Sequence, residues 1–375
     1  MQTSLLSFSA GTESVSRKME RLLSVRTQTL REWALLPLVP LSHLYGLGML
    51  TREWLYALGL FEQRALPVTV ISIGNLSVGG TGKTPVVIAL ANALREKGRR
   101  AGVISRGYGR RADEEVFEVS DGRSVRSNPE KTGDEPFLIA ERCPEVPVAV
   151  GVNRYIAGRY LLDRFGVDTL ILDDGFQHLA LKRTIDVLLL DATAPFGNGY
   201  LLPRGRLRER LSALGRATLL VVTRSDQARD LQGVLKAIRR VAPDTPLCVT
   251  DFIATALERI GACESQGPNA LKAERVVALS GIGNPDAFQR LLESLGAVVV
   301  HHCLFPDHHA YSLQDVHRVM KVAGDLQADR VLTTEKDAVK LRWLEGIDQA
   351  GMWAVRIDVE WKEGWEEWTR LVLRN

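Results

Sequence analysis

A lysine and a threonine follow a glycine-rich turn in the stretch Gly79-Gly-Thr-Gly-Lys83-Thr84. An apolar run over residues 68–73 precedes this turn, and a helix-forming segment over residues 86–96 follows it. That order is typical of a phosphate-binding P-loop, whose glycine N–H groups surround phosphate oxygens at the start of a helix. The lysine reaches the β- and γ-phosphates, and the threonine hydroxyl holds Mg²⁺. The predicted nucleotide-binding residues are Ser77, Val78, Gly79, Gly80, Thr81, Gly82, Lys83 and Thr84.

The P-loop departs from the strict pattern at one position, because Ser77 stands where the first glycine is usual. Gly79 and Gly80 keep the loop flexible, since glycine adopts backbone conformations that other residues avoid. The flanking strand and helix also argue against a chance lysine in an ordinary turn. The sequence therefore predicts that this chain binds a nucleoside triphosphate.

Two adjacent acids, Asp173 and Asp174, follow the apolar run over residues 169–172. An acid at the end of a strand downstream of a P-loop is typical of a Walker B aspartate, which holds Mg²⁺ directly or through water. The motif alone is common, and the upstream P-loop makes it more specific. We therefore expect Thr84, Asp173 and Asp174 to form a magnesium site.

Further polar residues have both a functional and an ordinary interpretation. Asp134 opens a helix-like segment, where an acid commonly just complements the helix dipole. Arg154 could bind phosphate or be solvated. His308 and His309 follow an acid, but adjacent histidines point in different directions, so the pattern favours a general base or its orienting partner over a zinc site. Lys336 follows another predicted strand and either faces the same cleft or belongs to an ordinary loop.

These residues need a scaffold, and the pattern of short apolar runs supplies one. Runs alternating with helix-like segments predict a parallel sheet with helices on both faces, and ligands in such sheets bind beyond the carboxyl ends of the strands. A second α/β pattern begins near residue 275. The runs occupy residues 101–105, 146–150, 169–172, 187–191 and 218–223, then 276–279, 297–302, 330–334 and 353–359.

The predicted fold is therefore an α/β, P-loop NTPase-like parallel-sheet domain with a second, smaller α/β domain and an N-terminal membrane-associating helical segment. A length of 375 residues fits about two domains of ordinary size. We expect an N-terminal extension with membrane-associating helices over residues 1–66, the P-loop domain over 67–245, and a linker with the C-terminal α/β domain over 246–375. Proline and glycine at 243–246 and 261–269 suit the connection.

The N-terminal segment resembles a membrane-surface element. Residues 33–51 contain no Asp, Glu, Lys or Arg, but Pro37 and Pro40 argue against a clean transmembrane span. We expect a helix pair in the membrane interface, with aromatic residues at the headgroup level. The alternative is that these helices simply pack on the α/β core. The preceding basic residues would attract anionic lipid, and they are Arg17, Lys18, Arg21, Arg26 and Arg31.

Composition excludes several other classes. A net charge of +3 is too small to argue for nucleic acid. The four cysteines lie far apart without metal-binding spacing, so neither a zinc site nor a disulfide framework is expected, and a reducing cytosolic setting fits. We expect no nucleic-acid partner and no obligate protein partner. Basic loops at the predicted sheet edge instead suggest an anionic substrate larger than the nucleotide.

Taken together and in order, the motifs resemble the tetraacyldisaccharide 4'-kinase (lipid A 4'-kinase) family from about Trp33 to the C-terminus. The motifs are Gly74-Asn75, Gly79-Gly-Thr-Gly-Lys-Thr-Pro85, Arg106-Gly-Tyr-Gly-Arg110, Gly133-Asp-Glu-Pro136, Leu172-Asp-Asp-Gly-Phe-Gln-His178, Leu202-Pro-Arg-Gly-Arg-Leu-Arg-Glu209, Asp307-His308-His309 and Thr334-Glu-Lys-Asp337. The resemblance implies a monotopic enzyme on the cytoplasmic face of the inner membrane. Such an enzyme transfers the γ-phosphate of ATP to the 4'-hydroxyl of a tetraacylated glucosamine disaccharide 1-phosphate.

The resemblance also implies roles for individual residues. Asp134 would be the catalytic base and His308 its partner across the interdomain cleft, beside Lys83 and Asp174. The expected cofactors are ATP and Mg²⁺, and the two domains should close over ATP. The expected substrate-binding residues are Arg154, Gln177, Arg208 and Glu209.

Two rival classes share parts of the pattern. Membrane-associated partitioning ATPases have a similar loop, but they carry a lysine where this chain has Val78. A GTPase would read guanine with an NKxD loop, and the corresponding stretch Thr223-Arg-Ser-Asp226 lacks both Asn and Lys. A kinase should hydrolyse ATP poorly without its lipid acceptor, whereas a switch should respond to dimerisation or to a protein partner.

Overall fold

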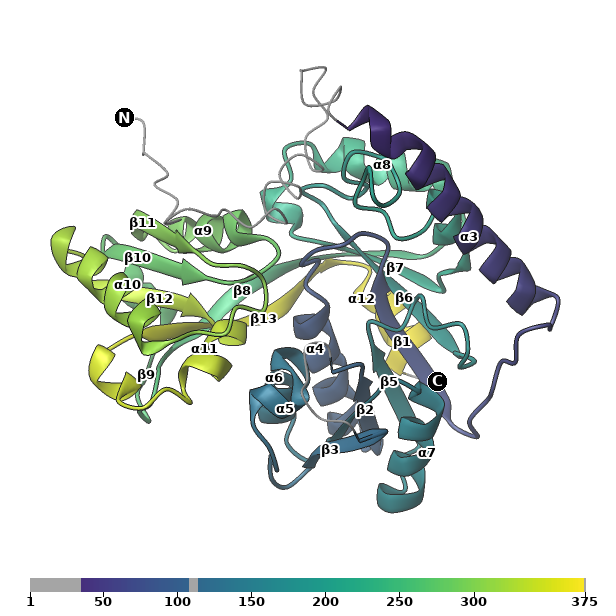
Figure 1. Ribbon diagram of the computed structural model, residues 1–375, viewed down its shortest axis with the longest axis horizontal. Coiled ribbons are helices and arrows are strands. Elements are labelled where there is room, and N and C mark those ends of the chain that lie inside the picture. The colour runs from purple at the N-terminus through teal and green to yellow at the C-terminus, as the bar shows by residue number, and fades with distance from the viewer. Residues whose placement is uncertain (1–34, 108–113, 374–375) are drawn as a thin grey trace.

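One sheet runs through both halves of the protein. The computed structural model describes residues 35–107 and 114–373. In that part of the chain, 13 strands join in the order β11-β10-β12-β13-β8-β7-β6-β1-β5-β2-β4-β3, with β9 paired to β8. Figure 1 shows the long strands β8 (Leu247–Arg259) and β13 (Trp353–Glu363) passing between the two halves.

The P-loop half is a parallel sheet with one antiparallel edge strand, β3 (Val116–Asp121). All residues of β2, β4, β5 and β7 are buried, as expected for a parallel sheet covered on both faces. The parallel strands are β1 (Thr69–Asn75), β2 (Ala101–Ser105), β4 (Pro147–Gly151), β5 (Thr169–Asp173), β6 (Ile185–Asp191) and β7 (Leu219–Thr223).

Four main helices cover this half. One apolar cluster joins α4 (Lys83–Glu96) and α6 (Asp134–Arg142) to β1, β4 and β5. Two other clusters join α7 (Arg154–Phe165) and α8 (Leu231–Val241) to the opposite face. The short elements of this half are α5 (Pro129–Thr132), η2 (Leu211–Arg216) and η3 (Ser225–Gln227).

The C-terminal half extends the sheet with three parallel strands. β10 (Arg275–Ser280) pairs with both β11 (Val298–Leu304) and β12 (Arg330–Thr334). One apolar cluster involves α9 (Pro285–Ser294), and a second involves α10 (Leu313–Asp325) and α11 (Glu335–Leu341). The short elements are β9 (Ser265–Gln266), η4 (Pro268–Leu271), η5 (Ile347–Ala350), α12 (Trp365–Trp368) and η6 (Thr369–Leu373).

The predicted α/β class, with a P-loop sheet and a second α/β unit, is confirmed. Each apolar run expected as a strand overlaps an observed strand. β3 and the 13-residue β8 were not predicted. β8 escaped detection because its second half alternates exposed and partly buried positions around Thr255 and Glu258, so that it presents no continuous apolar run.

The described part of the N-terminal segment, from residue 35, contains one α-helix, so the expected helix pair is not found in the residues that the structure describes. A 3₁₀ turn, η1 (Leu36–Leu38), leads into α3 (Val39–Ala57). Pro40 lies in the first turn of α3, where a missing N–H breaks no helical hydrogen bond, so the helix continues past Trp54. The basic residues Arg17, Lys18, Arg21, Arg26 and Arg31, and Trp33, lie outside the described residues.

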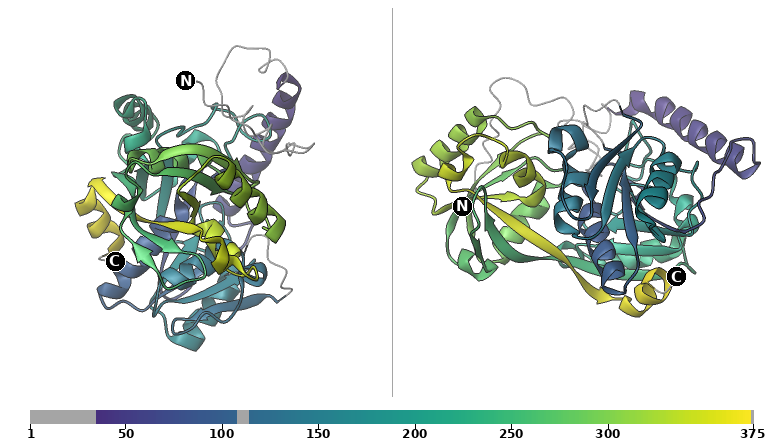
Figure 2. Two further views of the ribbon diagram at one scale, coloured as in Figure 1. Left: turned by 90° about the vertical axis from the view of Figure 1, so that its left-hand side faces the viewer. Right: turned by 90° about the horizontal axis from the view of Figure 1, so that it is seen from below.

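Helix α3 lies along the outer edge of the P-loop half (Figure 2). Ser42 Oγ donates to the carbonyl of Leu201 at 2.8 Å, and Tyr45 OH donates to the carbonyl of Arg208 at 2.9 Å. The helix also exposes large apolar side chains, which are Leu41, Leu44, Leu47 and Trp54. Among the described residues, no helix combines the length and the apolar character needed to cross a bilayer.

An arginine whose side chain is only 9% exposed joins α6 of the P-loop half to α11 and β13. Arg142, at the end of α6, forms ion pairs with Glu335 at the start of α11 and with Asp358 of β13. Glu335 also accepts a hydrogen bond from the backbone N–H of Ile357 at 3.0 Å. Burial raises the pKa of Glu335, although the positive charge of Arg142 opposes this effect.

We expect Arg142→Met to lower the free energy of unfolding by about 3–5 kcal/mol, because it leaves the buried Glu335 carboxylate without its counter-ion. Loss of Arg142 should raise the pKa of Glu335 further. A folded-state pKa above the unfolded value contributes stability at low pH and loses it as pH rises, so the deficit should be larger at pH 8 than at pH 5. Chemical denaturation at the two pH values measures both effects.

Arg342→Met is the matched control. Arg342 pairs with Glu141 of α6 at 2.8 Å, in a more exposed setting, and its loss should cost less than about 1 kcal/mol. Equal losses in the two variants, or no pH dependence, would contradict this account of Arg142.

Candidate active site

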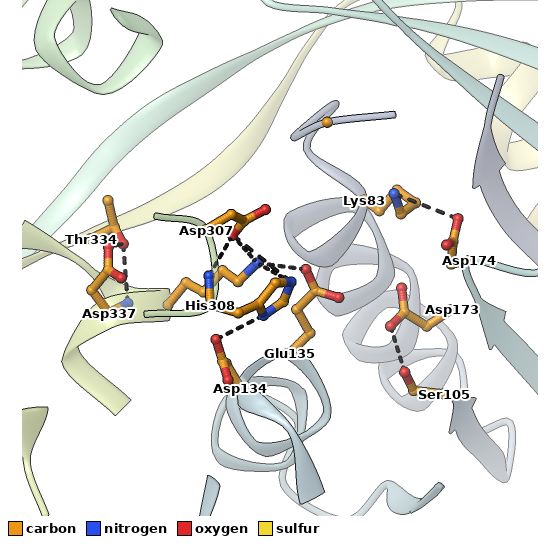
Figure 3. A network of polar contacts seen from close by, with 12 residues as sticks. Lys83, Ser105, Asp134, Glu135, Asp173, Asp174, Asp307, His308, Thr334 and Asp337 are labelled. Carbon is orange, nitrogen blue, oxygen red and sulfur yellow. Dashed lines mark hydrogen bonds and ion pairs between the residues drawn. The ribbon is translucent and has the colours of Figure 1, made fainter. Parts of the chain in front are cut away.

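A cavity of about 1090 Å³ lies between the two halves, where the strands of both present their carboxyl ends. The P-loop, Asp173, Asp174 and Arg208 line it from one half, and His308 and Lys336 line it from the other. This is where ligands bind in open parallel sheets. Most of the candidate residues therefore line a single space, and Figure 3 shows Lys83, Asp174 and His308 among them.

The P-loop has the strand, loop and helix order that the sequence predicts. It connects β1 to α4, and α4 begins at Lys83. Gly82 has a φ of +83°, and a Cβ atom there would lie 2.1 Å from Cζ of Phe252, so both backbone and space require glycine. The Lys83 amine donates to Asn75 Oδ1 at 3.2 Å and lies 3.5 Å from Asp174 Oδ1. Two oxygens therefore hold this amine at the edge of the cavity.

Asp173 ends β5 and is almost completely buried. Its Oδ2 accepts a hydrogen bond from Ser105 Oγ at 2.9 Å, whereas its Oδ1 has no hydrogen-bond partner among the described residues. Burial, together with the negative charges of Glu135 and Asp174, raises the pKa of Asp173. The charge of Lys83 lowers the pKa of Asp173 but does not outweigh burial and the neighbouring carboxylates.

Asp174 has a different environment. Its φ is +53°, and its carboxylate lies 2.8 Å from Arg208 and 3.5 Å from Lys83. Burial opposes its ionisation, but the charges of Lys83 and Arg208 outweigh burial and lower its pKa. Asp174 is thus a paired anion beside the unpaired Asp173.

A magnesium ion fits this arrangement. No group of three or more His, Cys, Asp and Glu side chains within the described ranges is arranged to hold a metal. Mg²⁺ at a nucleotide site typically takes only one or two carboxylates, with phosphate oxygens and water completing its shell. The unpartnered Oδ1 of Asp173 and the hydroxyl of Thr84, which lines the same cavity, are suitable ligands.

A second polar group joins the two halves across the cavity. His308 follows β11 in a positive-φ conformation (+59°), and its Nδ1 lies 3.1 Å from Asp134 Oδ2 at the start of α6. The amine of Lys340 lies 3.1 Å from the same oxygen. Burial opposes the ionisation of Asp134, but the hydrogen bond from His308 and the charges of Lys340 and Lys336 together lower its pKa well below the usual range. Asp134 is therefore ionised at neutral pH.

The structure gives His308 and His309 different partners, a distinction that the sequence alone did not allow. His309 Nε2 lies 3.2 Å from Asp315 Oδ2, and its ring packs against Phe305 and Tyr311. Asp315 also completes the capping box of α10, so His309 belongs to the packing of the C-terminal half. Of the two histidines, His308 is the one that contacts Asp134.

The predicted substrate-binding residues divide into two groups. Arg154, Gln177 and Arg208 line the cavity, and Arg208 Nη1 donates to Gln177 Oε1 at 3.4 Å. Glu209 is buried and does not line it, because its carboxylate pairs with Arg216 at 2.6 Å. Arg216 also pairs with Glu53 of α3. In the motif at residues 106–110, Tyr108, Gly109 and Arg110 lie outside the described residues.

Sequence reasoning missed three contributors to this cavity. Glu135 lines it directly, Lys340 contacts Asp134, and Gly283 lies so close to the P-loop that a Cβ atom there would be 2.7 Å from the N atom of Gly80. The Gly281-Ile-Gly-Asn284 segment directly follows β10, so inspecting every strand end would have found it. No local signal distinguishes Lys340 from an ordinary helix residue.

Apolar side chains form the remaining wall of the cavity. Phe252, Ile282, Phe288 and Leu291 contribute to it. In the stretch compared with a guanine-reading loop, Arg224 lines the cavity and pairs with Asp191. Asp226 does not line the cavity, and its N–H donates to Asp251 Oδ1 at 3.0 Å. The geometry therefore gives no support to guanine recognition by Asp226.

A glycine-rich loop between a parallel strand and a helix, with an acid ending the adjacent strand, defines a P-loop nucleotide-binding protein. The family model described as tetraacyldisaccharide-1-P 4'-kinase (LpxK) matches residues 34–374. The chain therefore belongs to the tetraacyldisaccharide 4'-kinase family, and the resemblance seen in its motifs is confirmed.

Individual relatives agree with this assignment. The chain is 43% identical over 339 residues to a protein of Anaeromyxobacter sp. (strain Fw109-5) named tetraacyldisaccharide 4'-kinase, with 88% of each chain covered. It is 42% identical over 316 residues to a protein of the same name from Syntrophus aciditrophicus, covering 82% of this chain and 84% of that one. A crystal structure of LpxK from Aquifex aeolicus in complex with ATP matches with a TM-score of 0.71 and 32% identity, over 90% of this chain and 98% of that one.

We expect His308→Gln to lower kcat for phosphoryl transfer by about 10²- to 10⁴-fold, the range for loss of a group acting in proton transfer. Removing the hydrogen bond from His308 should raise the pKa of Asp134. A base is lost as pH falls through its pKa, so the acid limb of the pH–rate profile should move to higher pH. Steady-state rates between pH 4 and 9 measure both effects.

His309→Gln, the same change one residue along, is the control. It should lower thermal stability through the lost contact with Asp315 but leave kcat within about twofold, because nothing ties His309 to Asp134. An equal fall in kcat for both variants would show that the histidines act through folding and not through Asp134.

Proposed function

We propose that this protein transfers the γ-phosphate of ATP to the 4'-hydroxyl of a tetraacylated glucosamine disaccharide 1-phosphate, a step of lipid A biosynthesis. Membership of the tetraacyldisaccharide 4'-kinase family supports the reaction. ATP as donor is supported by the ATP complex of the related Aquifex aeolicus protein. The observation that carries the proposal is the Asp134–His308 pair at 3.1 Å: Asp134 is buried, and its partner His308 lines the same cavity as the P-loop.

Each group has a defined part in the transfer. The 4'-hydroxyl oxygen forms a bond to the γ-phosphorus while the bond from that phosphorus to the β,γ-bridging oxygen breaks. The hydroxyl proton passes to Asp134, and ADP leaves with the bonding electrons on its terminal oxygen. His308 orients Asp134, and Lys83 stabilises the charge on the β- and γ-phosphates. Because the transition state is loose, the attacking oxygen needs little activation, and a weakly basic carboxylate such as Asp134 suffices.

We infer that Thr84 and Asp173 hold Mg²⁺, with Asp174 beside them. When bound, the ion neutralises the negative charge of the phosphates. Arg154, Gln177 and Arg208 bind the sugar or its phosphate, and Glu209 supports this region through Arg216. We also propose that a domain boundary near residue 246 lets the two halves close over ATP. This closure would bring His308 and Asp134 to the acceptor.

The lipid acceptor requires contact with a membrane surface, and the exposed apolar side chains of α3 support this inference. An amphipathic helix of this kind lies in the interface, with its apolar side chains among the acyl groups. We propose that the enzyme works as a monotopic protein on the cytoplasmic face of the inner membrane, where ATP is available.

The decisive experiment follows ³²P from γ-labelled ATP to tetraacyl disaccharide 1-phosphate in detergent micelles. The wild-type chain should yield a labelled lipid, and both Lys83→Ala and Asp134→Ala should reduce its rate of formation by at least about 10²-fold. Thin-layer separation of the lipid measures the product. An unlabelled lipid, together with ATP hydrolysis that rises on vesicles alone, would instead support a membrane ATPase switch.

Magnesium removal gives an independent prediction. EDTA should abolish transfer, and added MgCl₂ should restore it. Asp173→Asn should raise the MgCl₂ concentration required for half-maximal rate, because an amide oxygen is a weaker ligand than a carboxylate for this hard cation. Ser105→Ala, which removes only the hydrogen bond to Asp173 Oδ2, is the control and should shift this concentration far less. Full activity in excess EDTA would contradict the metal assignment.

A further inference from the structure

Lys336 brings a buried positive charge from the C-terminal half into the cavity. It is the second residue of α11, and its side chain is 16% exposed. The amine lies 2.9 Å from Glu135 Oε1 on α6 and 3.1 Å from Asp307 Oδ1, and it is 3.5 Å from His308 Nε2. One amine therefore contacts the opposite half of the protein and the histidine that pairs with Asp134.

Its partner Glu135 lies toward the P-loop. Figure 3 shows Glu135 with His308 on one side and with Asp173 and Lys83 on the other. The electrostatic effects agree with this arrangement, because Lys83 and Lys336 both lower the pKa of Glu135, against burial, and Glu135 raises that of Asp173. The Glu135 carboxylate thus lies between the amine of Lys336 and the groups expected to hold the nucleotide phosphates.

The ion pair with Glu135 is not needed to join α6 to α11. Arg142 already joins these helices through Glu335, and Arg342, directly after α11, joins them through Glu141 at 2.8 Å. Neither arginine lines the cavity. A lysine has a flexible four-carbon stem that lets its amine exchange partners. Burial opposes the charge of Lys336, but Glu135, Asp307 and Asp134 outweigh it and raise its pKa, so that the amine stays protonated.

We propose that Lys336 binds the γ-phosphate of the nucleotide, exchanging Glu135 for phosphate oxygens when ATP occupies the cavity. This inference rests on the proposed function. The oxygens of the transferring phosphoryl group carry negative charge throughout the reaction, and a fixed cation supplied from the second half stabilises them. Lys336 gives up no proton in this role. The exchange of Glu135 for phosphate oxygens makes the position of the C-terminal half depend on whether the nucleotide carries a γ-phosphate.

The test compares a nucleotide with and without the γ-phosphate. Isothermal titration of the full-length protein in detergent, with MgCl₂, measures binding of ADP and of the non-hydrolysable analogue β,γ-imido-ATP. Lys336→Met should weaken binding of the analogue by about 10- to 100-fold, the range for a charge-assisted hydrogen bond, and change ADP binding by less than about twofold. Lys336→Arg keeps the charge and should recover most of the affinity for the analogue.

Arg342→Met is the matched control, because it breaks an ion pair between the same two helices outside the cavity. It should change neither affinity. Equal weakening of both nucleotides by Lys336→Met, or unchanged binding of the analogue, would overturn the proposal. If Lys336→Met does not fold, Lys336→Gln, which also removes the charge, takes its place, and a ratio of analogue affinity to ADP affinity equal to that of the wild type overturns the proposal. A wild-type protein that binds neither nucleotide would overturn the proposed function as well.

Activity adds a readout that does not depend on binding affinity. With saturating ATP and lipid, Lys336→Met should lower kcat at least about tenfold and leave KM for the lipid unchanged, since the lysine acts on the phosphoryl group. A higher KM for the lipid with an unchanged kcat would assign Lys336 to the acceptor and contradict the proposal.

Discussion

An excess of carboxylates, one of them buried, at the meeting point of the two halves is the constraint on which the site depends. Glu135, Asp173 and Asp174 lie close together near the strand ends. The positive charge of Lys83 lowers the pKa of all three carboxylates. Such a group of anions is stable only if cations accompany it. The chain supplies Lys83, Arg208 and Lys336 from three separate elements. A bound Mg²⁺ would supply the remaining charge that Asp173 lacks.

The continuous sheet makes this meeting possible. Parallel strands present their carboxyl ends at a common edge, and β8 with β13 carries that sheet from the P-loop half into the C-terminal half. The loop after β11 therefore lies opposite the start of α6, so that Asp134 and His308 lie 3.1 Å apart although they are 174 positions apart in the sequence. The site is therefore complete only where residues of the P-loop half and of the C-terminal half meet.

Local features were readable from sequence, and contacts between distant residues were not. The P-loop and Asp173 were predicted because strand, glycine turn and helix follow one another directly. The fold class followed from the alternation of apolar runs. β8 was missed because its second half presents no continuous apolar run, and because its pairing with β13 and β7 is not visible in the local pattern. The pairing of Asp134 with His308 came from family resemblance, and the contribution of Lys340 required coordinates, because no spacing rule links α6 to α11.

The attachment of α3 has a consequence for how far the protein can reach. Its hydroxyls and Arg52 bond directly to backbone carbonyls of Leu201, Arg208 and Gln177, in the segments that line the cavity. If α3 lies in the membrane interface as we propose, its attachment would hold the strand ends at a constant height above the lipid. A sugar held at a different height would miss the site, however well its chemistry matched.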